Sequence, residues 1–169
     1  MKFEIERKFL IQNNDWEKRT TGHTTLRQAY LDDNPKLSIR VRIKDNSSAT
    51  LTLKSQTSSL RRLELEYPIP TIEAEALMQL RQGHVIEKVR YIVPEGDLTW
   101  EVDRFLGDNL GLVIAEVELP DEHHPVVLPS WVGAEVTGQA RYYNGALAYQ
   151  PFLSWPRTTP TAPTGTAAG

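Results

Sequence analysis

The stretch EIERKFL, residues 4–10, carries the pattern on which the fold prediction depends. Side chains alternate between the two faces of a β-strand, so residues two apart share a face. Glu4, Glu6 and Lys8 therefore lie on one face, and the apolar residues between and beside them lie on the other. The charged face points either into solvent or into an interior that needs charges.

Six later segments repeat this alternation, and their charges are sorted by sign from one segment to the next. The residues concerned are Arg40 and Arg42, Lys54, Glu64 and Glu66, Lys88 and Arg90, Glu101 and Asp103, and Glu116 and Glu118. For any one strand, a solvated face over an apolar core explains such a pattern. Seven strands with charges sorted in this way favour a shared, charged interior.

The order of the expected elements predicts a mostly β, α+β fold. We expect strands over 2–11, 25–32, 37–44, 49–55, 61–69, 85–93, 97–105 and 112–119, helices over 72–82 and 138–149, and an irregular stretch over 121–134. Short connections favour antiparallel pairing, and closure removes sheet edges. The prediction is an eight-stranded antiparallel β-barrel with a few flanking helices. A single domain would span residues 1–154, with a disordered tail over 155–169.

Composition narrows the class of protein. The chain has 169 residues, 40% of them apolar and 24% charged, which is typical of one globular domain. Its formal net charge of -3 indicates no nucleic-acid partner, and no apolar run is long enough to span a membrane. The absence of cysteine excludes disulfides and thiolate chemistry and fits a reducing compartment. We expect a cytoplasmic monomer or homodimer.

A charged interior implies a charged ligand, because buried charges are costly unless they are paired or bound to ions. Carboxylates without cysteine and with few histidines suit Mg²⁺ or Mn²⁺. Arginine and lysine bind phosphate oxygens. Together the two sets of side chains indicate a site for a polyphosphate and a divalent metal.

The same residues resemble the CYTH superfamily, the triphosphate tunnel metalloenzymes. The ExExK signature of that family is matched by Glu4-Ile5-Glu6-Arg7-Lys8, and the later charged pairs follow in the family's order. Its closing helix segment resembles Arg141-Tyr142-Tyr143-Asn144. The resemblance covers residues 1 to about 150. The resemblance implies an eight-stranded β-tunnel and metal-dependent chemistry on triphosphates. One departure is Gly138-Gln139-Ala140, where the family has an acidic residue and proline. It concerns the plug at the tunnel end rather than the metal site.

The resemblance also implies roles for individual residues. The implied metal ligands are Glu4, Glu6, Asp103, Glu116 and Glu118, and the implied triphosphate contacts are Lys8, Arg40, Arg42, Lys54, Lys88 and Arg90. Catalytic roles would fall to Glu6, Lys8, Glu116, Glu118, Lys88 and Tyr30, with support from Glu64, Glu66 and Glu101. Tyr30 stands where some short members have a tyrosine that pairs with the lysine at position 88.

The compact chain most resembles short inorganic tripolyphosphatases, so hydrolysis of tripolyphosphate to pyrophosphate and phosphate is the first hypothesis. The alternatives are a thiamine triphosphatase, a class IV-type adenylate cyclase and a non-catalytic polyphosphate-binding module. Eight carboxylates oppose the last alternative, because a pure polyphosphate binder needs mainly cations. Outside this set, we expect Trp100 in outer packing and His123 and His124 in a solvated loop.

Overall fold

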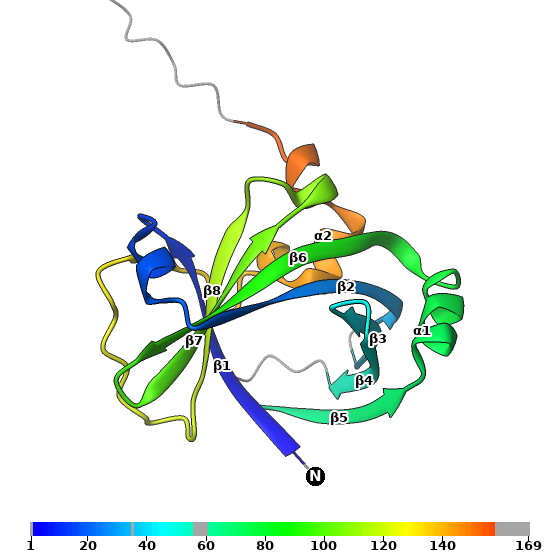
Figure 1. Cartoon of the computed structure of the whole chain (residues 1–169), viewed down its shortest axis with the longest axis horizontal. Coiled ribbons are helices and arrows are strands. Elements are labelled where there is room, and N and C mark those ends of the chain that lie inside the picture. Colours follow the sequence, from blue (N-terminus) through cyan, green and yellow to red (C-terminus); the bar gives the residue numbers. More distant parts are fainter. Residues whose placement is uncertain (1, 35, 56–60, 158–169) are drawn as a thin grey trace, which may run out of the picture.

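The fold is a closed antiparallel barrel, seen in a computed structural model that describes residues 2–34, 36–55 and 61–157. The strands within these ranges are β1 (Lys2–Ile11), β2 (Gly22–Asp33), β3 (Leu37–Lys44), β4 (Ser48–Ser55), β5 (Arg61–Ile69), β6 (Gln82–Glu95), β7 (Leu98–Phe105), β8 (Val113–Glu118) and β9 (Val132–Glu135). Their order is β5-β4-β3-β2-β6-β7-β8-β1-β9, and β1 also pairs with β5 (Figure 1). The predicted eight-stranded antiparallel barrel is confirmed, and β9 is an additional strand.

Strand β1 closes the barrel because it has different partners along its length. Its residues 6–10 pair with β8, with Lys8 opposite Glu116. On its other edge, residues 2–5 pair with β5 and residues 9–11 pair with β9. The N-terminal stretch that carries the first charged alternation therefore joins the two ends of the sheet.

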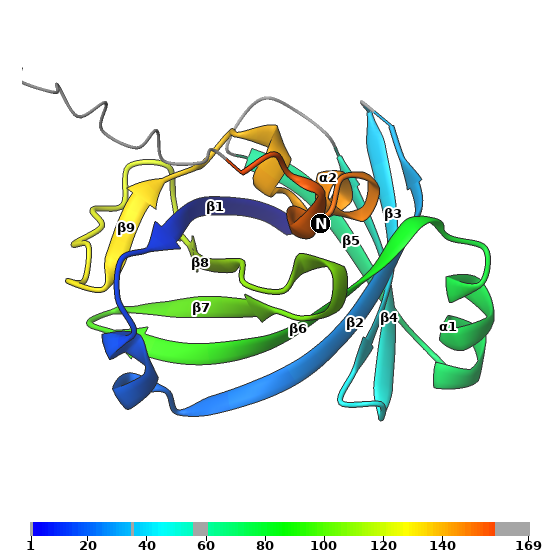
Figure 2. The same cartoon turned by 90° about the horizontal axis from the view of Figure 1, so that it is seen from above.

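Apolar side chains cover the outside of the barrel in two clusters. In one, Phe9, Trp100 and Trp131 pack together and are joined by Trp16 of a short 3₁₀-helix, Asp15–Arg19. The other lies between β2–β4 and helix α1 (Thr71–Met78), which runs along the outer face of these strands (Figure 2). The outer packing predicted for Trp100 is confirmed, since its side chain is fully buried in the first cluster.

A third apolar cluster occupies one end of the barrel interior. Ile86, Phe105 and Ile114 share strand faces with charged interior residues, yet they pack against Leu147 of helix α2 (Asn144–Tyr149). The interior face thus changes from charged to apolar along the strands. This change closes one end of the barrel with α2 and leaves the charged section as the accessible cavity.

The two expected helices are shorter than predicted. The helix expected over 72–82 ends at Met78, and the last residue of the expected range, Gln82, is the first residue of β6. The helix expected over 138–149 is divided into a 3₁₀ turn, Ala140–Tyr142, and the six-residue α2. The stretch expected to be irregular over 121–134 contains the start of β9.

Packing contacts continue one residue beyond the predicted domain end. Trp155 packs edge-on against Tyr142 and Phe152. The rest of the predicted tail, from residue 158, lies outside the described residues. No helix in the described ranges combines the length and apolar character needed to cross a bilayer.

Candidate active site

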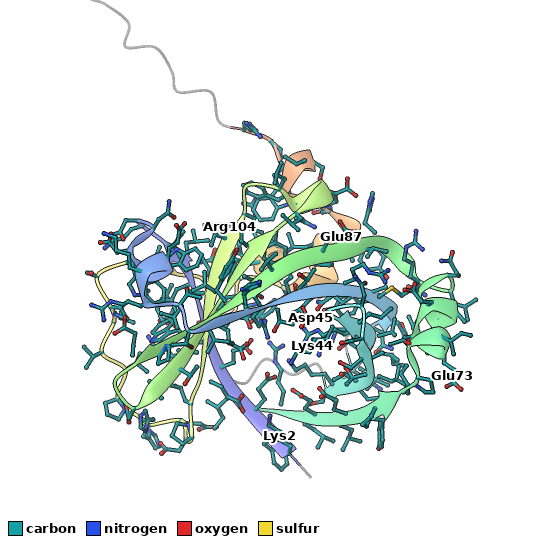
Figure 3. The ribbon with its side chains drawn as sticks, in the orientation of Figure 1. Lys2, Lys44, Asp45, Glu73, Glu87 and Arg104 are labelled. Atoms are coloured by element: carbon teal, nitrogen blue, oxygen red, sulfur yellow. The ribbon has the colours of Figure 1, made fainter. Side chains whose placement is uncertain are left out.

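The candidate site is the cavity inside the barrel, which we call the lumen. Its volume is about 760 Å³, and side chains from β1–β8 and from the segment around α2 line it. Sticks from several strands converge inside the ring of ribbons, with Lys2 at the N-terminal end of β1 (Figure 3). The lining contains most of the predicted residues: Glu4, Glu6, Lys8, Tyr30, Arg40, Arg42, Lys54, Glu64, Glu66, Arg90, Glu101, Glu116 and Glu118.

The acidic part of the lumen is built by neighbouring strands β1 and β8. Burial, together with the charges of Glu116 and Glu4, raises the pKa of Glu6 to about 8. Burial acts in the same direction on Glu116, but Lys8 and Arg90 outweigh it and hold the pKa of that carboxyl well below its usual value. The nearby cations Lys8 and Lys54 therefore offset only part of the negative charge around Glu6.

Several carboxylates are already engaged by lumen cations. Lys54 Nζ lies 2.5 Å from Glu4 and 4.0 Å from Glu64, and Lys8 Nζ lies 3.3 Å from Glu116. At the rim, Lys2 Nζ lies 3.6 Å from Glu118. In these ion pairs, lysine ammonium groups lie beside carboxylates that line the same cavity and offset their charge. In the described ranges, no three acidic or histidine side chains stand together closely enough to hold a metal ion as they are.

The basic part of the lumen, on β3, has fewer acidic partners. Arg42 Nε donates to Gln28 Oε1 at 2.9 Å, and burial together with the charges of Arg40 and Arg90 lowers the pKa of Arg42 to about 9. Arg40 Nη2 donates to Thr52 Oγ1 at 3.4 Å, and its buried Nε has no hydrogen-bond partner within the described residues. Buried polar groups are normally hydrogen-bonded, so an unsatisfied Nε beside the cavity indicates a place for an anion.

Lys88 and Asp103 lie behind the lining rather than in it. Both side chains are 0% exposed, and Lys88 Nζ lies 2.6 Å from Asp103 Oδ2. Arg90 donates to both oxygens of Asp103, at 2.7 and 2.8 Å. Burial alone would raise the pKa of Asp103, but Arg90 and Lys88 lower it.

These contacts describe the surroundings of three predicted site residues. Both oxygens of Asp103 accept hydrogen bonds from Lys88 or Arg90, and its role as a metal ligand stays a prediction. The side chain of Lys88 is enclosed, and its contact with a triphosphate stays a prediction. Its hydrogen bonds go to Asp103 and Asn144, whereas the Tyr30 hydroxyl accepts one from Gln28 at 3.5 Å. The expected pairing of Tyr30 with Lys88 is thus absent from the described contacts.

The remaining predicted acids have separate surroundings. Glu101 Oε2 lies 2.5 Å from Arg90 Nη1, and Glu66 accepts a hydrogen bond from Thr52 at 3.5 Å. Glu118 is half exposed at the rim. All three border the lumen, as the alternation predicts.

The structure adds lumen residues that the sequence analysis did not select. Arg62 lies directly opposite Glu4 in the β1–β5 pairing, and its place two residues before Glu64 could have revealed it. Tyr143 and Asn144 enter from the start of α2, where Tyr143 precedes the helix and Asn144 is its first residue, and no periodic pattern marks them. His124, expected in a solvated loop, instead lies at the rim with 18% of its side chain exposed, 3.1 Å from Asp97.

A closed antiparallel barrel lined inside by carboxylates and cations places this chain among proteins that bind a charged ligand within the barrel. Comparison with known proteins identifies the family: the CYTH domain matches residues 2–146, and the chain belongs to that family. The predicted resemblance is thereby confirmed.

Similar proteins cover nearly the whole chain. An inorganic triphosphatase of Acetivibrio thermocellus is 43% identical over 153 residues, which are 90% of this chain and 97% of the relative. An inorganic triphosphatase of Nitrosomonas europaea is 38% identical over 151 residues, covering 86% and 96%. A crystal structure of an inorganic triphosphatase superposes with a TM-score of 0.63 at 33% identity, covering 93% of this chain and 99% of that one.

Proposed function

We propose that the protein hydrolyses inorganic tripolyphosphate to pyrophosphate and phosphate with a divalent metal ion. The observation that carries this proposal is one cavity lined by many carboxylates and many cations together. A polyanion alone would leave the carboxylates uncompensated, and a metal alone would leave the arginines uncompensated. A metal-bound polyphosphate satisfies both. The two relatives named inorganic triphosphatase support this choice among triphosphates.

In this proposal the metal site consists of oxygen ligands from β1 and β8. Glu4, Glu6, Glu116 and Glu118 offer only carboxylate oxygens, which suit Mg²⁺ or Mn²⁺. When bound, such an ion supplies charge stabilisation at phosphate oxygens and lowers the pKa of a bound water. The carboxylates hold it beside the acidic wall. Glu64, Glu66 and Glu101 border the lumen and balance its cations.

The phosphate chain is bound by the cations of the lumen. Arg40 and Arg42 present donors that the described carboxylates do not engage through a hydrogen bond or ion pair, so they are available to phosphate oxygens. Lys8 and Lys54 exchange their carboxylate partners for phosphate, which also frees Glu116 and Glu4 for the metal. Lys88 and Asp103 act from behind the lining by fixing Arg90.

A phosphate-release assay tests the proposal with tripolyphosphate, ATP, thiamine triphosphate and pyrophosphate, each with Mg²⁺, Mn²⁺ or a chelator. We expect metal-dependent release, fastest from tripolyphosphate. In Glu6→Gln the rate should fall by more than the about 100-fold that loss of an outer-shell metal partner costs. Glu73→Gln, on the exposed side of α1 (Figure 3), is the matched control and should keep the wild-type rate.

Other outcomes would assign a different function. Cyclic AMP formed from ATP would favour the cyclase, and fastest release from thiamine triphosphate would favour that substrate. Calorimetric binding of polyphosphate without any release would favour a binding module. The choice between Mg²⁺ and Mn²⁺, the monomeric or homodimeric state, the cytoplasmic location and the absence of nucleic-acid and membrane partners stay predictions.

A further inference from the structure

The ammonium group of Lys8 contacts the chain segment 142–144, which leads into α2 and ends at the first residue of that helix. Its Nζ lies 3.4 Å from the carbonyl oxygen of Tyr142 and 4.7 Å from the ring centre of Tyr143. The Lys8 side chain is 4% exposed, and its acidic partner is Glu116. The segment therefore contacts this ammonium with a carbonyl and an aromatic face, neither of which carries a negative charge.

The next residue of the segment contacts the second buried lysine. Asn144 Oδ1 accepts a hydrogen bond from Lys88 Nζ at 3.2 Å, beside the ion pair of Lys88 with Asp103. Three consecutive residues, Tyr142 to Asn144, thus contact the ammonium groups of two lysines from different strands.

The segment itself is fixed to the barrel. The Tyr143 hydroxyl accepts a hydrogen bond from the backbone N–H of Gly138 at 2.9 Å, and the Arg62 guanidinium lies 4.8 Å from the centre of the same ring. Before it, the backbone N–H of Lys8 donates to Thr137 Oγ1 at 2.9 Å. After it, Leu147 is fully buried against the barrel end. The ring and the amide therefore stand in set positions relative to β1 and β6.

We propose that Tyr143 and Asn144 are positioning residues that set where the ammonium groups of Lys8 and Lys88 lie. A lysine stem has four rotatable carbons, so its ammonium needs contacts that fix it. A carboxylate fixes an ammonium but offsets its charge, whereas an aromatic face attracts it and leaves the full charge available to phosphate. This role rests on the proposed function, since it concerns the lysines of that site.

Kinetics on tripolyphosphate test the role of the ring. Tyr143→Leu removes the aromatic face at similar volume, and we expect kcat to fall about tenfold, with KM changed less than about threefold. Tyr143→Phe keeps the ring and loses the hydroxyl contact, so its kcat should fall at most about threefold. Tyr67→Leu, at a half-exposed tyrosine on the outer face of β5, is the matched control and should keep wild-type kinetics.

The amide of Asn144 has a parallel test. Asn144→Leu removes the acceptor, and we expect kcat to fall about tenfold. Asn144→Asp keeps an acceptor oxygen and should recover part of that loss. Equal kcat in wild type and Tyr143→Leu, or equal losses in the Phe and Leu variants and in both Asn144 variants, would overturn the role.

A measurement without substrate separates this proposal from the proposed function. In protein labelled at lysine side chains, the ring current of Tyr143 shifts the ε-methylene NMR signal of Lys8. We expect this signal to move toward its free-lysine position in Tyr143→Leu and to stay in Tyr67→Leu. An unmoved Lys8 signal would overturn the positioning role, even if variants unfold too readily for kinetics. A moved signal in a protein that hydrolyses no triphosphate would refute only the proposed function.

Discussion

At the scale of single residues, the lumen contains two kinds of cation. Lys8, Lys54 and Arg90 have carboxylate partners. Arg40 has only a long hydrogen bond to Thr52 and a buried, unsatisfied Nε within the described chain. A buried donor without a partner destabilises a fold, so such a residue is retained for its ligand and not for stability.

Arg40→Met should therefore separate stability from binding. We expect the free energy of unfolding of the ligand-free protein to stay the same or to rise by about 1 kcal/mol, because an unsatisfied buried donor is removed. The KM for tripolyphosphate should rise about tenfold or more, since a charged hydrogen bond to phosphate is lost. Urea denaturation and steady-state kinetics measure the two effects.

The control for Arg40 is Arg27→Met on the outer face of β2. Arg27 is paired with Glu75 on the surface. In Arg27→Met we expect the free energy of unfolding to fall by up to about 1 kcal/mol and the KM for tripolyphosphate to stay unchanged. If Arg40→Met loses as much stability as Arg27→Met, the view that Arg40 is uncompensated in the free protein is wrong.

Asp103 presents the opposite case, because it compensates two buried cations. Asp103→Asn leaves Lys88 and Arg90 without their shared carboxylate. We expect the free energy of unfolding, measured by urea denaturation at pH 7, to fall by about 3–5 kcal/mol. Asp108→Asn, at an exposed aspartate paired with His84, is the control and should lose less than about 1 kcal/mol.

The same substitution makes a prediction about pH. Because the folded-state pKa of Asp103 is lowered, its stabilisation is complete above the ordinary aspartate pKa of about 3.9 and is lost as pH falls toward the lowered value. The contribution of the Asp103 carboxylate to the difference in unfolding free energy between wild type and Asp103→Asn should therefore shrink below about pH 4. A difference that is independent of pH down to acid unfolding would contradict this account.

Alternation predicts which residues face the lumen but not how deep each one lies. The period of two placed Glu6, Arg42 and Glu116 on the inner face, where the structure has them. It could not show that Lys88 and Asp103 are sealed behind the lining, because depth depends on the apolar cluster that α2 completes. Arg62 obeys the same alternation, whereas Asn144 follows no strand pattern, since it is the first residue of α2.

At the scale of elements, the hairpins were predictable and the C-terminal closure was not. Turn residues mark strand ends, as at Asp45 and Asn46, which take the positive φ angles of a tight hairpin between β3 and β4. Helix α2 has six residues, too few for a helical period to stand out. Its position depends on tertiary contacts with β6, above all at Gly83.

Gly83→Ala should displace α2. Gly83 has a φ of +70°, and a Cβ there would lie 2.5 Å from the carbonyl oxygen of Ala148 in α2. We expect the left-handed backbone to cost about 1–2 kcal/mol and the backbone overlap to add at least about 1 kcal/mol. Thermal or urea denaturation measures the sum. Because α2 begins at Asn144, we also expect slower turnover of tripolyphosphate.

Gly96→Ala is the matched control for Gly83. Its φ is +63°, and apart from the adjacent residues no heavy atom of the described chain lies within 4 Å of the added Cβ. It should lose only the backbone contribution of about 1–2 kcal/mol and keep wild-type turnover. Equal losses at the two glycines would mean that α2 is not held by its close approach to β6.

At the scale of the whole molecule, the charges that line the lumen are nearly balanced. Its lining contains seven cationic and eight acidic side chains. The cations are Lys2, Lys8, Arg40, Arg42, Lys54, Arg62 and Arg90, and the acids are Glu4, Glu6, Glu64, Glu66, Asp97, Glu101, Glu116 and Glu118. In the free protein, part of each set compensates the other through ion pairs such as Lys54–Glu4. A ligand of one sign breaks these pairs and leaves the partner charges uncompensated.

Tripolyphosphate and metal should therefore stabilise the fold together more than the sum of their separate effects. A ligand at 100 times its dissociation constant adds about 2.7 kcal/mol to the unfolding free energy. Because each ligand frees the partner of the other, the affinity for each should rise in the presence of the other. Thermal unfolding with a tripolyphosphate analogue whose bridging oxygens are replaced by nitrogen avoids turnover. Additive shifts in melting temperature for Mg²⁺ and the analogue, with Glu6→Gln behaving as wild type, would contradict the lumen as the shared binding site of metal and polyphosphate.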